Sequence, residues 1–210
     1  MNVKLKELEL FLHESVDSVT AKLNTPMKAE DSEVNLKSLL QVALKNEWET
    51  MFLSAQWAIN EKSLPLQVNL VRLAGDEAKH FQLIQSFLGE DARVDQTPSA
   101  LYHHLIKLED TFKRIVTGPF TREYLAVMRN NLFLEYCEKL NSHETIAIYK
   151  VIQEDEKHHH EIGRKLLAPL LKTDGDLSHA KSLITDMLKV VDDMQEMVMI
   201  KRRLSHLPGC

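Results

Sequence analysis

The sequence predicts an all-α fold, and three observations lead to this prediction. Only six glycines and six prolines occur among 210 residues, which favours long helices over many short strands joined by turns. Apolar residues recur at helical spacing through most of the chain. Turn- and cap-forming residues interrupt this pattern at intervals that leave room for helices of several turns. Because a chain of this length can bury its own core without disulfides or metal, we expect one domain over residues 1–210.

The interruptions divide the chain into a series of expected helices. Each boundary has the chemistry of a turn or a helix cap. In chain order the boundaries are Asn24-Thr25-Pro26, Ser63-Leu64-Pro65, Gly89, Thr97-Pro98, Gly118-Pro119, Asn141-Ser142, Asp174-Gly175-Asp176 and Pro208-Gly209. The helices expected between them cover residues 2–23, 34–61, 65–88, 99–116, 119–140, 143–171 and 177–205.

The long helices form two expected hairpins, 34–88 and 119–171, because each pair is joined by a tight turn. A longer connection from Gly89 to Gly118, which carries its own helix, joins the two hairpins. This order is typical of a four-helix bundle with one long crossover connection. The core bundle is therefore expected at about 34–171. The helices added to it are those at 2–23, 99–116 and 177–205.

The charge and the hydropathy pattern exclude several functions. The formal net charge is −5, and the only basic cluster is short, Lys201-Arg202-Arg203, so we expect no nucleic-acid surface. No stretch approaches the roughly 18 apolar residues that a membrane-spanning helix needs. The N-terminus is too charged for a secretory signal. The two cysteines, Cys137 and Cys210, make neither a disulfide framework nor a Cys-x-x-Cys metal site. We expect a cytoplasmic protein with no membrane partner.

Two motifs of the same form occur, one on the second helix of each expected hairpin. They are Asp76-Glu77-Ala78-Lys79-His80 and Asp155-Glu156-Lys157-His158-His159. In each motif Glu and His stand three residues apart, so both project from one helix face, one turn apart. Their neighbours on that face are mostly apolar, and burying an unpaired carboxylate is costly. The motifs therefore predict a buried metal site.

The first helix of each hairpin should supply the remaining carboxylates, because residues level with each other are about equidistant from the turn. Reflecting Glu77 through the first turn leads to Glu47, a lone acid in an apolar stripe. Reflecting Glu156 through the second turn leads near position 127, and Glu123 faces the bundle one turn from that level. The alternatives on the same helix are Glu135 and Glu138. For either of them to lie level with Glu156, the turn would have to fall inside the next expected helix.

Together these residues make an expected dinuclear site. Four carboxylates carry a charge of −4, which two divalent ions would neutralise if both imidazoles are neutral. Oxygen-rich ligation with two imidazoles favours Fe or Mn, or a mixed pair, over Zn. The expected ligands are Glu47, Glu77, His80, Glu123, Glu156 and His159.

Three further residues lie near the metal-facing side of these helices. His160 lies about 40° from Glu156 around the helix and is the alternative to His159 as a ligand. Tyr149 could donate an electron or a hydrogen bond, or could simply pack in the core. Asn130 could hydrogen-bond a ligand carboxylate or a water molecule.

The pattern resembles the ferritin-like diiron-carboxylate superfamily over about residues 34–171. In that family one Glu from each of two helices joins a Glu-x-x-His from each of the other two. The resemblance implies that Glu77 and Glu156 bridge the metals and that each metal takes one imidazole. It also implies that Glu47 and Glu123 are terminal ligands.

The same resemblance implies roles for the acids that open the two motifs. Asp76 and Asp155 would each accept a hydrogen bond from the histidine of the opposite motif helix, which fixes the tautomer of that histidine.

The doubled motif is more similar to bacterioferritins, rubrerythrins, ribonucleotide reductase small subunits and hydroxylases than to storage ferritins. No rubredoxin-type Cys-x-x-Cys module occurs, and the added helices favour an enzyme with a covered pocket. The resemblance thus implies a diiron oxidase or oxygenase that uses O2 to oxidise a small organic substrate, with electrons from a separate donor protein. The alternative is an iron-handling ferroxidase or storage protein of bacterioferritin or rubrerythrin type. The Met-rich final helix could form a homodimer surface.

Overall fold

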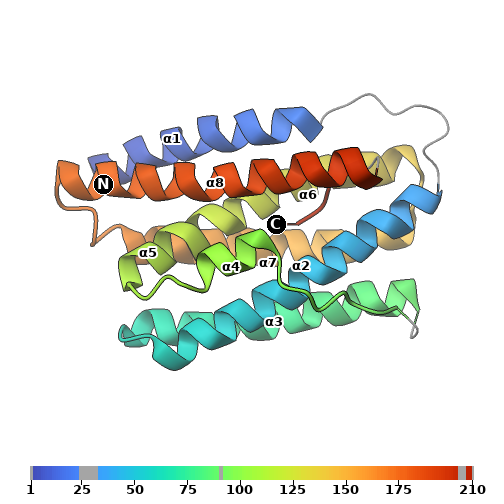
Figure 1. Cartoon of the computed structure of the whole chain (residues 1–210), viewed down its shortest axis with the longest axis horizontal. Helices are drawn as coiled ribbons and strands as arrows, with labels where there is room; N and C mark the ends of the chain where they lie inside the picture. The colour runs from blue at the N-terminus through green and yellow to red at the C-terminus, as the bar shows by residue number, and fades with distance from the viewer. Residues whose placement is uncertain (1, 24–32, 90–91, 203–206, 210) are drawn as a thin grey trace.

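Every regular element formed by the described residues of the computed structural model is a helix (Figure 1), so the all-α prediction is confirmed. The described residues are 2–23, 33–89, 92–202 and 207–209. Their elements are α1 (Val3–Thr20), the 3-10 helix η1 (Ala21–Leu23), α2 (Glu33–Asn60), α3 (Leu64–Leu88), α4 (Ala100–Leu105), α5 (Thr111–Ile115), the π-helix η2 (Val116–Arg122), α6 (Glu123–Lys139), α7 (His143–Leu167) and α8 (Asp174–Arg202).

The two hairpins expected from the sequence are present. Helix α2 packs along α3, helix α6 packs along α7, and contacts between α3 and α7 join the hairpins. Helices α1 and α8 lie side by side in Figure 1 and contact each other, and α1 also contacts α6. The pair α1 and α8 therefore adds a further layer on the α6 side of the hairpins.

The turn between α2 and α3 is held by one buried acid. Glu61 accepts hydrogen bonds from the backbone N–H groups of Lys62 and Ser63, at 2.9 Å each. Its other oxygen pairs with Arg114 of α5 at 2.9 Å, and both side chains are buried. Pro65 occupies the first turn of α3, where the missing N–H would have no intrahelical partner. The hairpin turn and the crossover connection are thus tied together.

The prediction of a single helix at 99–116 is wrong, because the structure has two short helices there, α4 and α5. Asp110 accepts a hydrogen bond from the backbone N–H of Lys113 at 3.1 Å, which starts a new helix. The Arg114 guanidinium donates to the carbonyl of Leu108 at 2.8 Å and so holds the interruption between α4 and α5.

The break expected at Gly118-Pro119 is also wrong, because the chain passes from α5 to α6 without leaving helical structure. Proline disrupts an α-helix by removing the bond to the carbonyl four residues earlier. The π-helix η2 pairs residues five apart instead. All seven residues of η2 are buried, and a Cβ at Gly118 would lie 2.8 Å from the Trp57 ring. Tertiary packing therefore overrides the local turn chemistry.

Two other boundaries differ from expectation. Helix α7 ends at Leu167 rather than 171, because Pro169 has no backbone N–H to donate to a carbonyl one turn earlier. Helix α8 begins at Asp174, within the residues expected to form a turn. Thr173 and Asp176 each accept a hydrogen bond from the other's backbone N–H, at 3.1 and 2.7 Å, which is a capping box. The expected end of this helix at 205 lies outside the described residues.

The core consists of two apolar clusters. In one, Leu66, Leu70, Trp57, Phe120 and Leu167 pack with residues of α1 and α8. In the other, residues from the opposite ends of the hairpin helices pack together; these include Leu40, Leu44, Ile84, Phe133, Tyr149 and Ile152. Along α2, α3 and α7 the two clusters lie on opposite sides of the predicted metal ligands. The candidate site therefore lies between two regions from which water is excluded.

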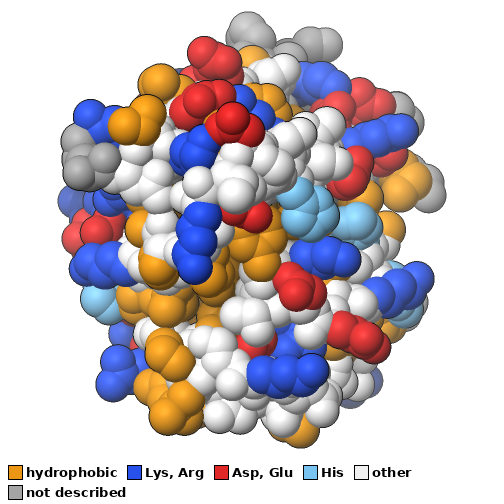
Figure 2. Space-filling model, turned by 90° about the vertical axis from the view of Figure 1, so that its left-hand side faces the viewer, with side chains coloured by type: hydrophobic (Ala, Val, Ile, Leu, Met, Phe, Trp, Pro, Cys, Tyr) orange, Lys and Arg blue, Asp and Glu red, His pale blue; other side chains and the backbone are white. Residues whose placement is uncertain are grey.

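On the face shown in Figure 2, acidic and basic side chains are mixed, and hydrophobic side chains are visible in a hollow between them. None of the helices described is both long and apolar enough to span a membrane.

Candidate metal centre

The structure brings all six predicted ligands together in the interior. They come from the four hairpin helices, where the i, i+3 spacing of each motif turns Glu and His to one face. Their exposed fractions are 3% for Glu47, 2% for Glu77, 0% for His80, 1% for Glu123, 3% for Glu156 and 3% for His159. The alternatives Glu135 and Glu138 are exposed, so hairpin reflection selected the buried acid on α6.

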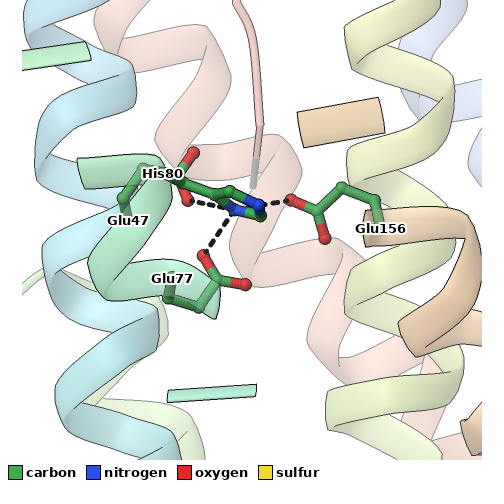
Figure 3. A group of neighbouring side chains, drawn as sticks. All are labelled: Glu47, Glu77, His80 and Glu156. Carbon is green, nitrogen blue, oxygen red and sulfur yellow. Dashed lines mark ion pairs between the residues drawn. The ribbon is translucent and has the colours of Figure 1, made fainter. Parts of the chain in front are cut away.

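These side chains form two groups that could each hold a metal ion. One group is Glu47, Glu77, His80 and Glu156, and it is drawn in Figure 3. The other is Glu77, Glu123, Glu156 and His159. Within each group one donor atom per residue lies within 4.8 Å of all the others. Glu77 and Glu156 belong to both groups, so the two groups form one continuous site.

The imidazole of His80 lies between the acids of its group and Asp155. Its Nδ1 is 3.6 Å from Glu47, 3.6 Å from Glu77 and 4.0 Å from Glu156. Its Nε2 lies 3.2 Å from Asp155 Oδ2, on the other motif helix. Nε2–H therefore donates to Asp155, and Nδ1 faces the carboxylates.

His159 repeats this arrangement from α7. Its Nδ1 lies 3.4 Å from Glu123 and 3.5 Å from Glu156, and its Nε2 lies 3.0 Å from Asp76 Oδ2. The two imidazole rings are 6.5 Å apart between centroids. Each motif thus supplies the carboxylate that orients the histidine of the other motif, as the family resemblance implied.

Buried ligand atoms without hydrogen-bond partners are a second observation that fits a bound metal pair. Several of these buried atoms have no hydrogen-bond partner among the described residues, and leaving such an atom unsatisfied costs about 1–3 kcal/mol each. A cation in each group would satisfy the atoms that belong to that group. The atoms are His80 Nδ1, His159 Nδ1, Glu123 Oε2 and Glu156 Oε2.

Protonation of the site follows from burial and mutual charge. Burial raises the pKa of Glu77 and Glu156 well above the usual range, and the charges of Glu47 and Glu123 raise them further. Burial lowers the pKa of His80, but Glu47 and Glu77 more than offset this and raise it to about 12. The metal-free site therefore favours protons on the carboxylates shared by both groups.

Burial and neighbouring charges also shift the pKa values of His159 and of the two outer carboxylates. The outer carboxylates are Glu47 and Glu123, which each belong to one group only. Burial opposes the charge on His159, yet Glu123 raises its pKa to about 10. Burial also opposes the charge on Glu123, but Glu156, His159 and Arg122 lower its pKa to about 2. The pKa of Glu47 is lowered against burial by Glu77 and His80. The outer carboxylates thus stay charged while the shared ones hold protons.

Arg122 is a feature of the site that the sequence reasoning missed. It ends η2, is 2% exposed, and its charge lowers the pKa of both Glu47 and Glu123. The available signal was an arginine next to a predicted ligand and between the apolar residues Phe120 and Leu125. The expected break at Gly118-Pro119 hid this signal, because it placed Arg122 in the first turn of a helix rather than within a continuous buried one.

Of the three further residues, His160 is not part of the ligand groups. Its Nδ1 donates to the carbonyl of Phe120 at 2.8 Å, so it ties α7 to η2, and His159 is the histidine that faces the acids. Asn130 accepts a hydrogen bond from the backbone N–H of Gly209 at 2.8 Å, and its amide nitrogen donates to no ligand carboxylate among the described residues.

Tyr149 is fully buried beside the site. Its ring lies 4.5 Å from that of Phe133, and its hydroxyl has no hydrogen-bond partner among the described residues. Burial raises the pKa of its phenol well above 10, with a smaller contribution from the charge of Glu47. The side chain of Tyr149 is thus uncharged and packed in the core, close enough for the charge of Glu47 to affect its pKa.

Comparisons with protein-family models, curated proteins and solved structures found no match for this chain. The function proposed below therefore rests on the residues of the site.

Proposed function

We propose that the chain is a non-haem diiron oxidase or oxygenase, in which O2 is used to oxidise a small organic substrate. The observation that carries the proposal is the sharing of Glu77 and Glu156 between two groups that each include one histidine. Two metal ions that share carboxylates lie close enough to act on one molecule together. The oxygen-rich donor set favours iron, with manganese or a mixed pair as the chemical alternative.

The proposal assigns a role to each member of the site. Glu77 and Glu156 would bridge the metals, Glu47 and His80 would complete one coordination sphere, and Glu123 and His159 the other. Bound iron would supply the redox chemistry that activates O2, and a separate protein would supply the electrons.

The remaining residues control the surroundings of that chemistry. Asp155 and Asp76 hold the proton on each Nε2, so that each Nδ1 lone pair points inward. Arg122 adds a buried positive charge beside the outer carboxylates. The two apolar clusters on either side exclude water from the site.

The architecture that would hold this centre is a ferritin-like four-helix bundle. Helices α2, α3, α6 and α7 would form the bundle, with α4, α5 and η2 in the crossover and α1 and α8 added outside. The pairing of α2 with α3 and of α6 with α7, and the contacts between α3 and α7, support this assignment.

Metal analysis of protein purified without chelator tests the proposal. We expect a pair of Fe or Mn ions per chain, and loss of that metal in Glu77→Ala and Glu156→Ala. The matched controls Glu135→Ala and Glu138→Ala change exposed acids of α6 and should keep the metal. Less than about one tenth of an equivalent of Fe or Mn in the unmodified protein would reject the proposal. Metal loss in Glu135→Ala but not in Glu123→Ala would reject the ligand assignment on α6.

A second candidate function, iron handling by a ferroxidase or store, is favoured by one observation. A small pocket at the site is lined by Asn46 and Thr50 together with the four carboxylates, and this lining of oxygen donors would attract a cation. Assembly size and stoichiometry separate the two functions. A large hollow oligomer that oxidises many iron ions per chain would favour iron handling, whereas a monomer or dimer that retains its metal would favour the oxygenase.

A further inference from the structure

The four hairpin helices do not close the metal centre on every side by themselves. Helix α3 packs against α7, whereas α2 and α6 have no comparable contact among the described residues. These two helices carry the outer carboxylates, Glu47 on α2 and Glu123 at the start of α6. Both carboxylates are nevertheless buried. Another part of the chain must therefore cover the space between α2 and α6.

Residues 207–209, which we call the strap, fill this space. In Figure 3 the strap descends in pale red between α2 and α6 toward the labelled side chains. Asn46 of α2 donates a hydrogen bond to the carbonyl of Pro208 at 3.3 Å. Asn130 of α6 accepts one from the backbone N–H of Gly209 at 2.8 Å. The strap thus bridges the two helices that do not pack along each other.

The strap lies directly against a candidate ligand. A Cβ at Gly209 would be 3.7 Å from Glu47 Oε1. The small pocket formed by the four carboxylates has no room for a water molecule. A hydrated metal ion, which is larger than a water molecule, therefore cannot enter on this side while the strap is in place.

The strap is attached by few contacts. The side chain of Leu207 is 4% exposed and belongs to the apolar cluster that includes Leu40 and Leu44. The guanidinium of Arg129 donates to the carbonyl of Gly209 at 3.3 Å. A segment held by one apolar anchor and by single hydrogen bonds can open locally, without unfolding of the helices beside it.

The other sides of the site offer no comparable opening among the described residues. The two apolar clusters close it in both directions along the helices. On the side of α3 and α7, a small pocket reaches His159 and Asp76. Because Asp76 binds His159 Nε2 there, the imidazole ring stands between this pocket and the acids. Passage on that side requires a ligand to leave, whereas passage under the strap does not.

We propose that the strap is the gate of the metal centre, and that metal ions enter and leave between α2 and α6 when residues 207–209 move away. This inference rests on the proposed function, because it concerns the metal of that site. A closed strap retains the metal as a resident cofactor, as an oxygenase requires, and opposes its passage as cargo.

Two variants open the strap without changing a ligand. Leu207→Ser removes the apolar anchor and should shift the strap toward its open state at least about tenfold. Gly209→Val serves if the first variant does not fold, because a β-branched residue is strained at the φ of 64° found there. The matched control Leu10→Ser makes the same chemical change at an exposed position of α1.

The rates of Mn(II) uptake and release measure the gate. Uptake by the metal-free full chain is followed by loss of the EPR signal of free Mn(II). Release is followed as the metal left on the protein after timed exposure to excess EDTA. We expect both rates to increase at least about tenfold in both strap variants and to stay unchanged in Leu10→Ser, because a gate controls passage in each direction.

Two results would overturn the inference. Unchanged uptake and release in both strap variants would mean that the metal enters elsewhere. Faster release with unchanged uptake would mean that the strap only adds affinity.

Hydrogen exchange of the metal-free protein separates this inference from the proposed function. Leu207→Ser should speed amide exchange in α2 near Asn46 and in α6 near Asn130, and Leu10→Ser should not. If the unmodified protein binds neither Mn(II) nor Fe(II), the diiron function is rejected. Faster exchange would then still support closure of the site by the strap, and unchanged exchange would reject it.

Discussion

At the residue scale, the decisive feature is how charge is balanced among the buried acids and histidines. Four carboxylates share one interior site, and the pKa values of the two shared ones and of both imidazoles are raised. Protons on those groups reduce the repulsion in the metal-free protein. Two divalent ions bring the same charge as four protons, so metal can replace the protons without leaving a net charge in the core.

This exchange predicts that metal binding releases protons. His80 and His159 bind metal only as neutral imidazoles, and Glu77 and Glu156 only as carboxylates. Because these pKa values are raised in the metal-free protein, affinity should fall as the pH is lowered and increase as it is raised. At pH near 7 we expect about two protons released per Mn(II) bound, measured with an indicator dye in weak buffer. An affinity that is constant between about pH 6 and 8 would contradict this account.

At the element scale, the site depends on a close approach of α7 to η2. A Cβ at Gly163 would lie 2.5 Å from the backbone of Pro119, closer than carbon atoms can pack. His159, one turn before Gly163, and Glu156, two turns before it, face Glu123, which directly follows η2. The missing side chain at Gly163 therefore sets the distance between two helices that carry candidate ligands.

Gly163→Ala should force α7 away from η2 and destabilise the protein by about 1–3 kcal/mol, as expected for overpacking. It should also lower the metal content, because Glu156 and His159 move with α7. The matched control is Gly75→Ala, at an exposed position within α3 with no atom near the added Cβ. That change should stabilise the helix by about 0.5–1 kcal/mol. Equal effects of both substitutions on the urea midpoint would show that the α7–η2 contact is not tight.

At the scale of the whole molecule, the candidate ligands connect the two hairpins. Glu47, Glu77 and His80 belong to the first hairpin, and Glu123, Glu156 and His159 to the second. A metal pair would therefore link α2 and α3 to α6 and α7 across the region between the two apolar clusters. Bound metal should stabilise the folded chain as a unit, because the unfolded chain cannot present these donors together.

The expected size of this stabilisation can be measured. Free metal at about 100 times its dissociation constant adds about 2.7 kcal/mol. For a chain of this size that corresponds to a rise of about 5–11 °C in the melting temperature. The rise should vanish in Glu77→Ala and remain in Glu135→Ala, as followed by circular dichroism. An equal rise in both variants would mean that the metal binds elsewhere.

Local patterns predicted most of this centre before any tertiary structure was known. Glu77 with His80, and Glu156 with His159, follow from helical spacing alone, and Glu47 follows from its distance to the hairpin turn. Glu123 was harder to select because it lies one turn from the reflected level. The structure decides the choice by burial, because Glu123 is buried while Glu135 and Glu138 are exposed.

What the sequence by itself determined, then, is the all-α fold, the two hairpins and the six candidate ligands, because these depend on periodicities and turns within a few residues. Tertiary structure alone decided the continuity of the helix through Pro119, the burial of Arg122 and the position of Gly209 beside Glu47. Each of these depends on packing between segments distant in the chain. Buried neighbours can hold a backbone or a charge in a state that its local sequence disfavours.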